Sequence, residues 1–554
     1  MSATATAAPA TAGRAGSRLP RWWPLAAITL LAAALRFSTL GEQSFWYDEA
    51  FTPVHVLHPS LWATLRAVVH TENTPPLWYV LAWLDSRILG TGEVALRLPS
   101  ALAGVATVPV AWAIGRELSG RVAAVITAAL VAVNPLFVWY SQEARAYALF
   151  VLLSALAMLC FLRAEREPTP GRMAAFAVTG ALALLTHYFA VFLLIGMVLW
   201  LARDRARLRR ALPAIAGLAL VCLALLPLII AQGGHGTQWI GRWPLSERLQ
   251  AIAQYYLTGY SGAPLGHGVE VLMALPIIAG LALGLWCMLE RPRTVRPQAS
   301  RQAAGDGRAA PSAPPGARTG GLGRVSGAGA RAERGARVAL LIAATGILVP
   351  VVLAFFGADY LAPRNLVAAM IPVTALIALM LAAIARREGA LTAGRASERP
   401  AVTGASGPTV ALALTIVLGF LAISIDVPLS PRLQRGNWRG VARVLKAPAR
   451  ERVITTVELG AAPLEYYLHG LHNLAPGTSV TVTEIDETGY APLRSGAGRP
   501  PAPGFHLLER VDVDGLIVYR FVSAVPRKVS EATLRRHVIT LAHPEVLVPG
   551  MASE

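Results

Sequence analysis

Two adjacent carboxylates, Asp48 and Glu49, follow the first apolar segment of the chain, inside the aromatic sequence FWYDEAF. An acidic pair at the end of a bilayer span is costly to bury, so it needs water, a cation or a reaction to explain it. A carboxylate in such a place can take a proton from an incoming hydroxyl as a general base. Five segments carry groups able to do such chemistry: Asp48 and Glu49; His70 and Glu72; Glu143, Arg145 and Tyr147; His187 and Tyr188; Tyr360 and Arg364.

The composition of the chain is that of a membrane protein. Of 554 residues, 55% are hydrophobic and 15% are charged, and the mean hydropathy of +0.51 excludes an ordinary soluble domain. The net charge of +18 does not indicate nucleic-acid binding, because the basic residues gather in short loops between apolar runs. The abundance of Ala, Gly, Pro and Arg is typical of a GC-rich bacterial genome, so we expect a bacterial plasma membrane. The three cysteines lie in apolar runs, so neither a disulfide framework nor a cysteine zinc site is expected.

Eleven apolar runs are predicted to cross the membrane. An odd number places the N-terminus in the cytoplasm and the C-terminal part outside, and the arginines of the inner loops agree with this. We therefore predict a polytopic α-helical membrane domain, 21–425, between a disordered cytoplasmic tail, 1–20, and a small external α/β domain, 426–554. The predicted spans are 22–40, 94–115, 122–139, 146–164, 173–188, 189–202, 211–231, 269–289, 338–357, 365–385 and 409–425.

The segments between the spans also carry structural signals. Two semi-apolar pieces of the first external loop, Ser60–His70 and Pro76–Leu89, are too short to cross and are predicted to be interfacial helices. Residues 290–337 hold ten arginines among Gly, Ala, Pro and Ser and are predicted to form a disordered cytoplasmic loop. In the C-terminal domain we predict strands at 452–457, 479–484 and 515–522 and helices at 438–445 and near 463–468, with no element predicted after Arg527.

This topology brings all five polar segments to the outer face of the membrane. Simpler explanations stay open for several of their residues. Arg145 and Arg364 can be anchors to lipid phosphates, and Glu143 can favour the positive N-terminal end of a helix. His187 and Tyr188 can form a polar turn. What points to a functional site is the asymmetry, because the inner loops carry no comparable set.

Other polar residues near the first external loop also have alternative explanations. Arg36 is expected to be a snorkelling anchor or the partner of a carboxylate. His55, His58, His70 and Glu72 are possible ligands of a divalent cation, although their spacing fits no specific metal motif. We therefore predict no metal site and no essential cofactor, while a divalent cation stays possible.

Five motifs follow one another along the chain: LRFSTLGEQSFWYDEA, ENTPPLWYVLAWL, ALRLPSALAGVATVPVAWAIGREL, NPLFVWYSQEARAYAL and THYFAVFLL. With these motifs the chain resembles the bacterial family 39 membrane glycosyltransferases of the GT-C superfamily, which are similar to the protein O-mannosyltransferases and to the aminoarabinose transferases that modify lipid A. The resemblance covers about residues 20–385. It implies catalysis on the outer face and a donor that is a sugar on a polyprenyl phosphate.

The resemblance also implies roles for single residues. The acid that follows the first span in this family corresponds to Asp48, with Glu49 beside it, and the acid ahead of a Pro-Pro pair corresponds to Glu72. Asn73 stands where related transferases often have a lysine, so aminoarabinose specificity is not implied. The arginine-bearing loop before a late span corresponds loosely to Tyr360 and Arg364.

Sugar transfer from a phosphate agrees with these residue types. Phosphate is already a good leaving group, so the reaction needs cations to stabilise the departing charge and a base for the incoming hydroxyl. We expect Asp48 to be the base of an inverting transfer, with Glu49 and Glu72 as further catalytic acids. Arg145, Arg364 and Tyr360 are expected to bind the donor phosphate. Substrate-binding roles are expected for His70, Glu143, Tyr147, His187 and Tyr188.

The expected partners are a polyprenyl-phosphate sugar, a lipid, glycan or protein acceptor, and membrane lipids, with no nucleic acid. A transporter or flippase of lipid-linked sugars is the main alternative, and it predicts charged or broken-helix sites near the bilayer midplane and internal repeats, neither of which is evident. A non-catalytic scaffold is a second alternative, which leaves the polar outer loops unexplained.

Overall fold

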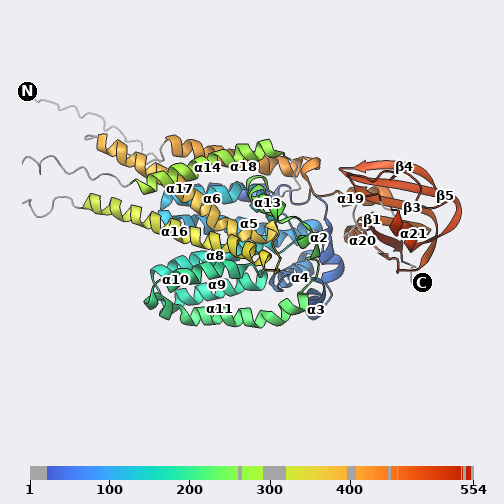
Figure 1. Ribbon diagram of the computed structural model, residues 1–554, viewed down its shortest axis with the longest axis horizontal. Helices are drawn as coiled ribbons and strands as arrows, with labels where there is room; N and C mark the ends of the chain where they lie inside the picture. Colours follow the sequence, from blue (N-terminus) through green and yellow to red (C-terminus); the bar gives the residue numbers. More distant parts are fainter. Residues whose placement is uncertain are drawn as a thin grey trace, which may run out of the picture.

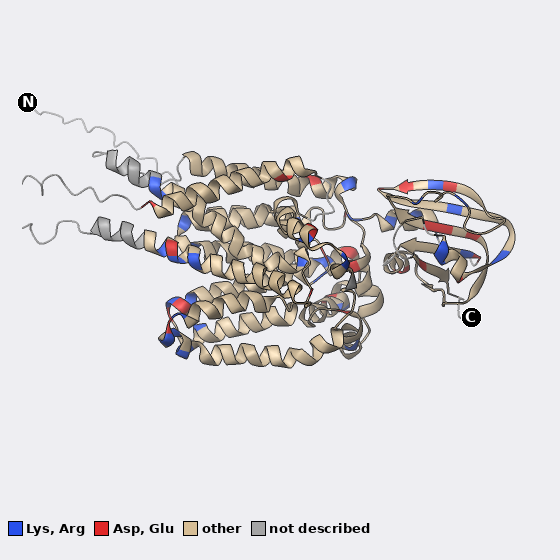
Figure 2. Cartoon of the chain, in the orientation of Figure 1, with Lys and Arg blue, Asp and Glu red and all other residues tan. Residues whose placement is uncertain are grey.

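The computed structural model is a long bundle of helices with a β-sheet domain at one end (Figure 1). It describes residues 22–259, 265–290, 320–395, 407–446, 451–457, 460–537, 539–540 and 544–550. Charged residues of the described chain gather at the two ends of the bundle and in the sheet domain, while the middle of the bundle is almost free of them (Figure 2). This distribution is typical of helices that cross a membrane, because ionised side chains are expensive to place in hydrocarbon.

Seven described helices are long and apolar enough to cross a bilayer. An eighth candidate is a pair of helices bent by 54°, and three shorter apolar helices complete the set. Each of the eleven predicted spans coincides with one of these elements, while the number that crosses the membrane stays a prediction. The seven are α5 (Glu93–Ser119), α8 (Tyr147–Arg166), α11 (Arg205–Gln232), α14 (His267–Leu289), α16 (Gly320–Phe355), α17 (Met370–Arg395, preceded by the 3-10 helix η2, Pro363–Ala369) and α18 (Gly407–Leu429). The bent pair is α6 (Arg121–Val133) with α7 (Pro135–Ser141), and the shorter helices are α1 (Trp23–Phe37), α9 (Pro170–Thr186) and α10 (Ala190–Ala202).

The bend between α6 and α7 has a local cause. Pro135 has no N–H, so the helical partner of the Val131 carbonyl is missing. Arg36 of α1 supplies donors instead, from Nη2 to Val131 O at 3.3 Å and from Nη1 to Ala132 O at 2.9 Å. Arg36 is fully buried. The prediction that it is a lipid anchor or a carboxylate partner is therefore wrong, because it satisfies the carbonyls of a broken helix.

The segment predicted to be the first external loop forms short helices at the end of the bundle next to the sheet domain (Figure 1). These are α2 (Tyr47–Phe51), the π-helix η1 (Thr52–Val56), α3 (Leu61–Thr71) and α4 (Leu77–Leu89). The two predicted interfacial helices coincide with α3 and α4, and α3 begins where the Ser60 hydroxyl accepts a hydrogen bond from the Ala63 amide. Two more short helices, α12 (Gln238–Arg242) and α13 (Leu245–Thr258), follow α11.

The predicted disordered loop 290–337 needs a correction. The structure describes residues 320–337, and they are the first turns of α16. Arg334 pairs there with the buried Glu165 of α8, and at Gly335 an added Cβ would lie 2.7 Å from the Leu118 carbonyl oxygen. Close packing and an ion pair therefore stabilise a helix where composition indicated a loop. Residues 291–319 and the predicted tail 1–20 lie outside the described residues.

The C-terminal domain is a six-stranded sheet in the order β2-β6-β1-β3-β5-β4, in which only the β1–β3 pair is parallel. Helices α19 and α20 pack on one face and α21 on the other. The predicted strand 452–457 and helix 438–445 are confirmed, and the segment after Arg527 adds the end of β5, α21 and β6. The elements are α19 (Trp438–Leu445), β1 (Arg452–Val457), α20 (Ala461–Leu468), β2 (Leu471–Asn473), β3 (Ser479–Tyr490), β4 (His506–Val513), β5 (Leu516–Ser530), α21 (Glu531–Arg536) and β6 (Pro544–Pro549).

Candidate active site

Asp48 of α2 and Arg364 of η2 form an ion pair. Oδ2 of Asp48 is 2.6 Å from Nη1 of Arg364, and each side chain is 20% exposed, so the pair lies partly at the surface of the protein. Pro363 suits the first position of η2, because its fixed φ is already helical. The Arg364 guanidinium also lies 5.1 Å from the ring centre of Trp239 on α12. Two groups that the sequence selected separately are thus in direct contact.

Glu72 and Arg145 form a second ion pair beside the first. Glu72 ends α3 in an extended conformation, and its Oε2 is 3.1 Å from Nη2 of Arg145. The Tyr79 hydroxyl donates a hydrogen bond to the same carboxylate oxygen. Nη1 of Arg145 lies 3.4 Å from the backbone oxygen of Asp48 and joins this pair to α2. Arg145 is therefore held between Glu72 and the segment that carries Asp48.

His187 lies near the two arginines of these ion pairs. His187 lies at the end of α9, is almost fully buried and stacks on Phe150 at 4.6 Å between ring centres. His187 is therefore held against α8, the helix that follows the segment with Arg145.

Tyr147 and Tyr188 have different surroundings. Tyr147 is buried at the start of α8, with its ring centre 4.8 Å from that of Tyr140 and 6.0 Å from that of His187. Tyr188 donates a hydrogen bond to Gln232 at 2.6 Å, and Gln232 in turn donates to the backbone carbonyls of Val68 and Thr74. Tyr147 thus lies beside the candidate site, whereas Tyr188 contacts Gln232, which joins α11 to the segment that carries Glu72.

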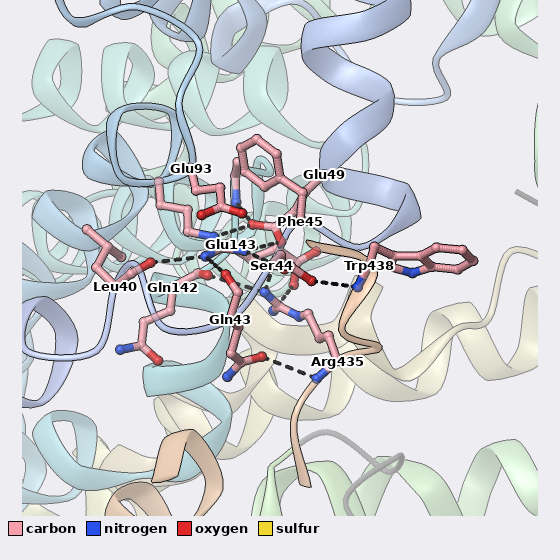
Figure 3. A network of polar contacts seen from close by, with 12 residues as sticks. Leu40, Gln43, Ser44, Phe45, Glu49, Glu93, Gln142, Glu143, Arg435 and Trp438 are labelled. Carbon is pink, nitrogen blue, oxygen red and sulfur yellow. Dashed lines mark hydrogen bonds and ion pairs between the residues drawn. The ribbon is translucent and has the colours of Figure 1, made fainter. Parts of the chain in front are cut away.

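Glu49 is fully buried and points away from Asp48's partner. Its carboxylate accepts two hydrogen bonds from Arg97, at 2.7 and 2.6 Å, and one from the Ala144 amide at 2.8 Å. Nη1 of Arg435 lies 3.3 Å from Oε2 of Glu49. Burial alone would raise the pKa of Glu49, but these charges and hydrogen bonds outweigh it and lower the pKa. Glu49 is therefore an ionised group at the centre of a buried network (Figure 3).

Glu143 belongs to the same network. Its Oε2 is 2.8 Å from Nη2 of Arg435, while its Oε1 has no hydrogen-bond partner within the described part of the chain. Burial, opposed by Arg435 and reinforced by the charges of Glu49 and Asp48, raises the pKa of Glu143 to about 7. Glu143 is thus partly protonated near neutral pH. A carboxylate that only stabilises the positive N-terminal end of a helix would be ionised there.

Two predicted site residues, Tyr360 and His70, lie apart from the ion pairs of Asp48 and Glu72 and from the network around Glu49. The Tyr360 side chain is 46% exposed, and its backbone oxygen accepts a hydrogen bond from Asn365. His70 is exposed on α3. His55 pairs with Glu465 of the sheet domain at 3.4 Å. Across the described residues, no group of three or more His, Cys, Asp or Glu side chains is placed to hold a metal ion.

Three residues near the site were missed from the sequence: Arg97, Arg435 and Tyr79. Arg97 was detectable, because an arginine inside an otherwise apolar run is a recognised functional signal. Arg435 stands in a segment without a motif, and its partners Glu49 and Glu143 are 386 and 292 residues away. Tyr79 lies among other aromatic residues of α4, so nothing in the sequence distinguishes it.

Comparisons with known proteins extend this description. Residues 73–230 match the family model described as dolichyl-phosphate-mannose-protein mannosyltransferase. Over 222 residues the chain is 27% identical to a putative mannosyltransferase, YkcB, of Bacillus subtilis strain 168. That alignment covers 37% of this chain and 30% of the relative, so the chain matches about a third of the relative's length.

Two solved structures share the fold of nearly the whole chain. The crystal structure of ArnT from Cupriavidus metallidurans bound to undecaprenyl phosphate superposes with a TM-score of 0.51 and 13% identity, over 90% of this chain and 98% of ArnT. The apo structure of the same ArnT superposes with a TM-score of 0.50 and 13% identity, over 90% and 97%. The helical bundle with its C-terminal sheet domain is therefore the ArnT fold, and the predicted resemblance of this chain to the GT-C membrane glycosyltransferases is confirmed.

Proposed function

We propose that this chain is a membrane glycosyltransferase that moves a sugar from a polyprenyl phosphate to an acceptor hydroxyl, with inversion at the anomeric carbon. The observation that carries the proposal is the contact of Asp48 with Arg364, next to the Glu72–Arg145 pair. A base and two guanidinium groups in one place are what this reaction requires. The family-model match and the ArnT fold support a transferase over a transporter or flippase.

The proposed chemistry assigns one role to each group. The bond between the anomeric carbon and the phosphate oxygen breaks, and its electron pair leaves on the phosphate. Arg364 and Arg145 stabilise that charge, since a planar guanidinium has five N–H donors and can contact Asp48 and a phosphate oxygen together. The acceptor oxygen bonds to the anomeric carbon as its proton passes to Asp48. A single base opposite the leaving group leads to inversion.

The two other predicted acids receive supporting roles in this proposal. Both oxygens of Glu72 face Arg145, at 3.1 and 3.5 Å, and Tyr79 donates to one of them. Glu72 therefore orients Arg145. Glu49 has no exposed surface and is surrounded by arginines, so it fixes the position of α2. Asp48 is left as the acid with both exposure and a place beside the phosphate-binding groups.

The proposal places the site on the outer face of a bacterial plasma membrane. Helix α2, which carries Asp48, lies at the end of the bundle next to the sheet domain (Figure 1). Blue Lys and Arg residues also gather at the opposite end of the bundle (Figure 2). Arg163 and Arg166 in the last turn of α8 and Arg207 in the first turn of α11 lie there. Loops rich in arginine stay in the cytoplasm, which supports an outer site.

Release of polyprenyl phosphate tests the proposed function. Purified protein in detergent would be incubated with a panel of polyprenyl-phosphate sugars and an envelope extract as acceptor, with Asp48→Asn as the matched control. We expect the wild type to release polyprenyl phosphate and the variant to release little. Transport of lipid-linked sugar across vesicles without any release would instead assign the chain to the flippases.

A further inference from the structure

We propose that Arg435, in the linker to the sheet domain, is a positioning residue through which this domain completes the active site. The inference rests on the proposed function. Arg435 lies between the 3-10 helix η3 (Pro431–Leu433) and α19. Its guanidinium donates to Glu49 at 3.3 Å, to Glu143 at 2.8 Å and to the backbone oxygen of Gln142 at 3.2 Å (Figure 3).

The surroundings of Arg435 are those of a built site. Its side chain is 3% exposed, and its two carboxylate partners are 0% and 1% exposed. The guanidinium carbon also lies 4.3 Å from the ring centre of Trp139 and 5.5 Å from that of Trp46. Burying an arginine is unfavourable unless partners compensate its charge, and a well-packed apolar residue would often stabilise the fold as well. We infer that the charge is present because it fixes the positions of Glu49 and Glu143.

The contacts of Arg435 connect the segment that carries Asp48 with the segment that carries Arg145. Glu49 is the neighbour of Asp48 on the five-residue helix α2, so a shift of Glu49 moves the proposed base. Glu143 stands two residues before Arg145, and the amide between them, of Ala144, donates to Glu49. One guanidinium thus ties the segment that carries the base to the segment that carries a phosphate-binding arginine.

The linker around Arg435 is fixed by its own hydrogen bonds. The Arg435 amide donates to Gln43, and the Ser44 hydroxyl donates to the Gly436 oxygen at 3.0 Å. The Trp438 amide donates to the same Ser44 hydroxyl at 3.0 Å. Trp46 packs in one apolar cluster with Trp438 and the sheet. The same contacts therefore hold the sheet domain against the bundle and keep Arg435 in its place.

The electrostatics agree with a positioning role. Six described groups act on Glu143 from the surrounding elements, and Arg435 is the cation in direct contact with it. They are Arg435 of the linker, Glu49 and Asp48 of α2, Arg364 of η2, Tyr140 of α7 and Tyr147 of α8. With the pKa of Glu143 raised to about 7, loss of Arg435 would raise it further and leave the carboxyl protonated, without an ion pair to hold its loop.

Arg435→Ala, Arg435→Lys and a matched control, Arg439→Ala, test the inference. Arg439 bonds to Glu93 at 3.2 Å in the same domain contact but does not touch the site acids. In Arg435→Ala we expect kcat to fall by roughly 10- to 100-fold, since small misplacements of reacting groups have effects of that order. The donor KM should change by less than about threefold, because Arg145 keeps its own ion pair with Glu72 in this variant. Arg435→Lys and added guanidinium should each restore part of kcat, and Arg439→Ala should keep it.

Hydrogen exchange of the 44–51 backbone amides supplies a readout that does not depend on activity. Exchange should be faster in Arg435→Ala and unchanged in Arg439→Ala, because Arg435 contacts Glu49 whereas Arg439 contacts Glu93. Wild-type kcat and exchange in Arg435→Ala would overturn the inference, as would an equal loss in Arg439→Ala or a proportional rise in donor KM. If Arg435→Ala does not fold, wild-type kcat in Arg435→Lys overturns it. Faster exchange in a protein that releases no polyprenyl phosphate would refute the proposed function alone.

Discussion

Replacement of Asp48 by asparagine is the sharpest test of the proposed chemistry. Asparagine keeps the shape and still accepts a hydrogen bond from Arg364, but it cannot take the acceptor's proton. A positioned general base contributes typically 10²- to 10⁴-fold, so kcat should fall by roughly 100-fold or more, or about 2.7 kcal/mol of barrier. The broken ion pair is worth only about 1 kcal/mol, because both side chains are 20% exposed. Arg364 keeps its charge and its planar donors in the variant, so donor KM should stay within about fivefold of wild type.

The assay measures sugar transfer at several donor concentrations in membranes that hold matched amounts of each variant. The melting temperature in detergent serves as the folding control and should be nearly unchanged in Asp48→Asn. Glu72→Gln should have an intermediate activity, because it loosens Arg145 without removing the base. Full activity in Asp48→Asn together with an inactive Glu72→Gln would move the base to Glu72 and refute the reasoning.

Four further predictions concern Arg364, the buried acids Glu49 and Glu143, and the membrane topology. Arg364→Ala should raise the donor KM and lower kcat together, and Arg364→Lys should recover only part, since a point charge cannot replace the planar fork; wild-type kinetics in both would leave Arg364 as a lipid anchor. Glu49→Gln should lower the melting temperature strongly, because unpairing buried Arg97 and Arg435 costs about 3–5 kcal/mol; an unchanged melting curve would contradict this. The pKa of Glu143, about 7 when folded against 4.5 as the ordinary value, means that its contribution to stability is complete below about pH 4.5 and is lost as pH rises through 7. The decrease in melting temperature between about pH 5 and 8 should therefore be smaller in Glu143→Gln, and identical pH curves would refute the burial argument. Reporter fusions at Gly316 and Gly504 should lie on opposite sides of the membrane, and a common side would disprove the eleven-span topology.

The sequence alone was sufficient for the helical scaffold. Apolar runs of bilayer length are a local signal, so all eleven predicted spans coincide with apolar helices of the structure. Composition was a poorer guide at 320–337, where contacts of Arg334 and Gly335 with other helices stabilise a helix in a Gly- and Arg-rich segment. A local signal cannot include the energy of contacts made with distant segments.

The same distinction applies to the candidate site. The residue types at Asp48, Glu72, Arg145 and Arg364 indicated one polar cluster, and the structure brings these four together. Only the tertiary structure separated Asp48 from its neighbour Glu49, since α2 turns one carboxylate to an accessible arginine and buries the other. Arg435 was beyond prediction as well, because ion pairs between residues hundreds of positions apart depend on how the bundle and the sheet domain pack. Hydropathy and motifs determine which residues gather at one end of the helical bundle, and the packing of distant segments decides which of them face one another.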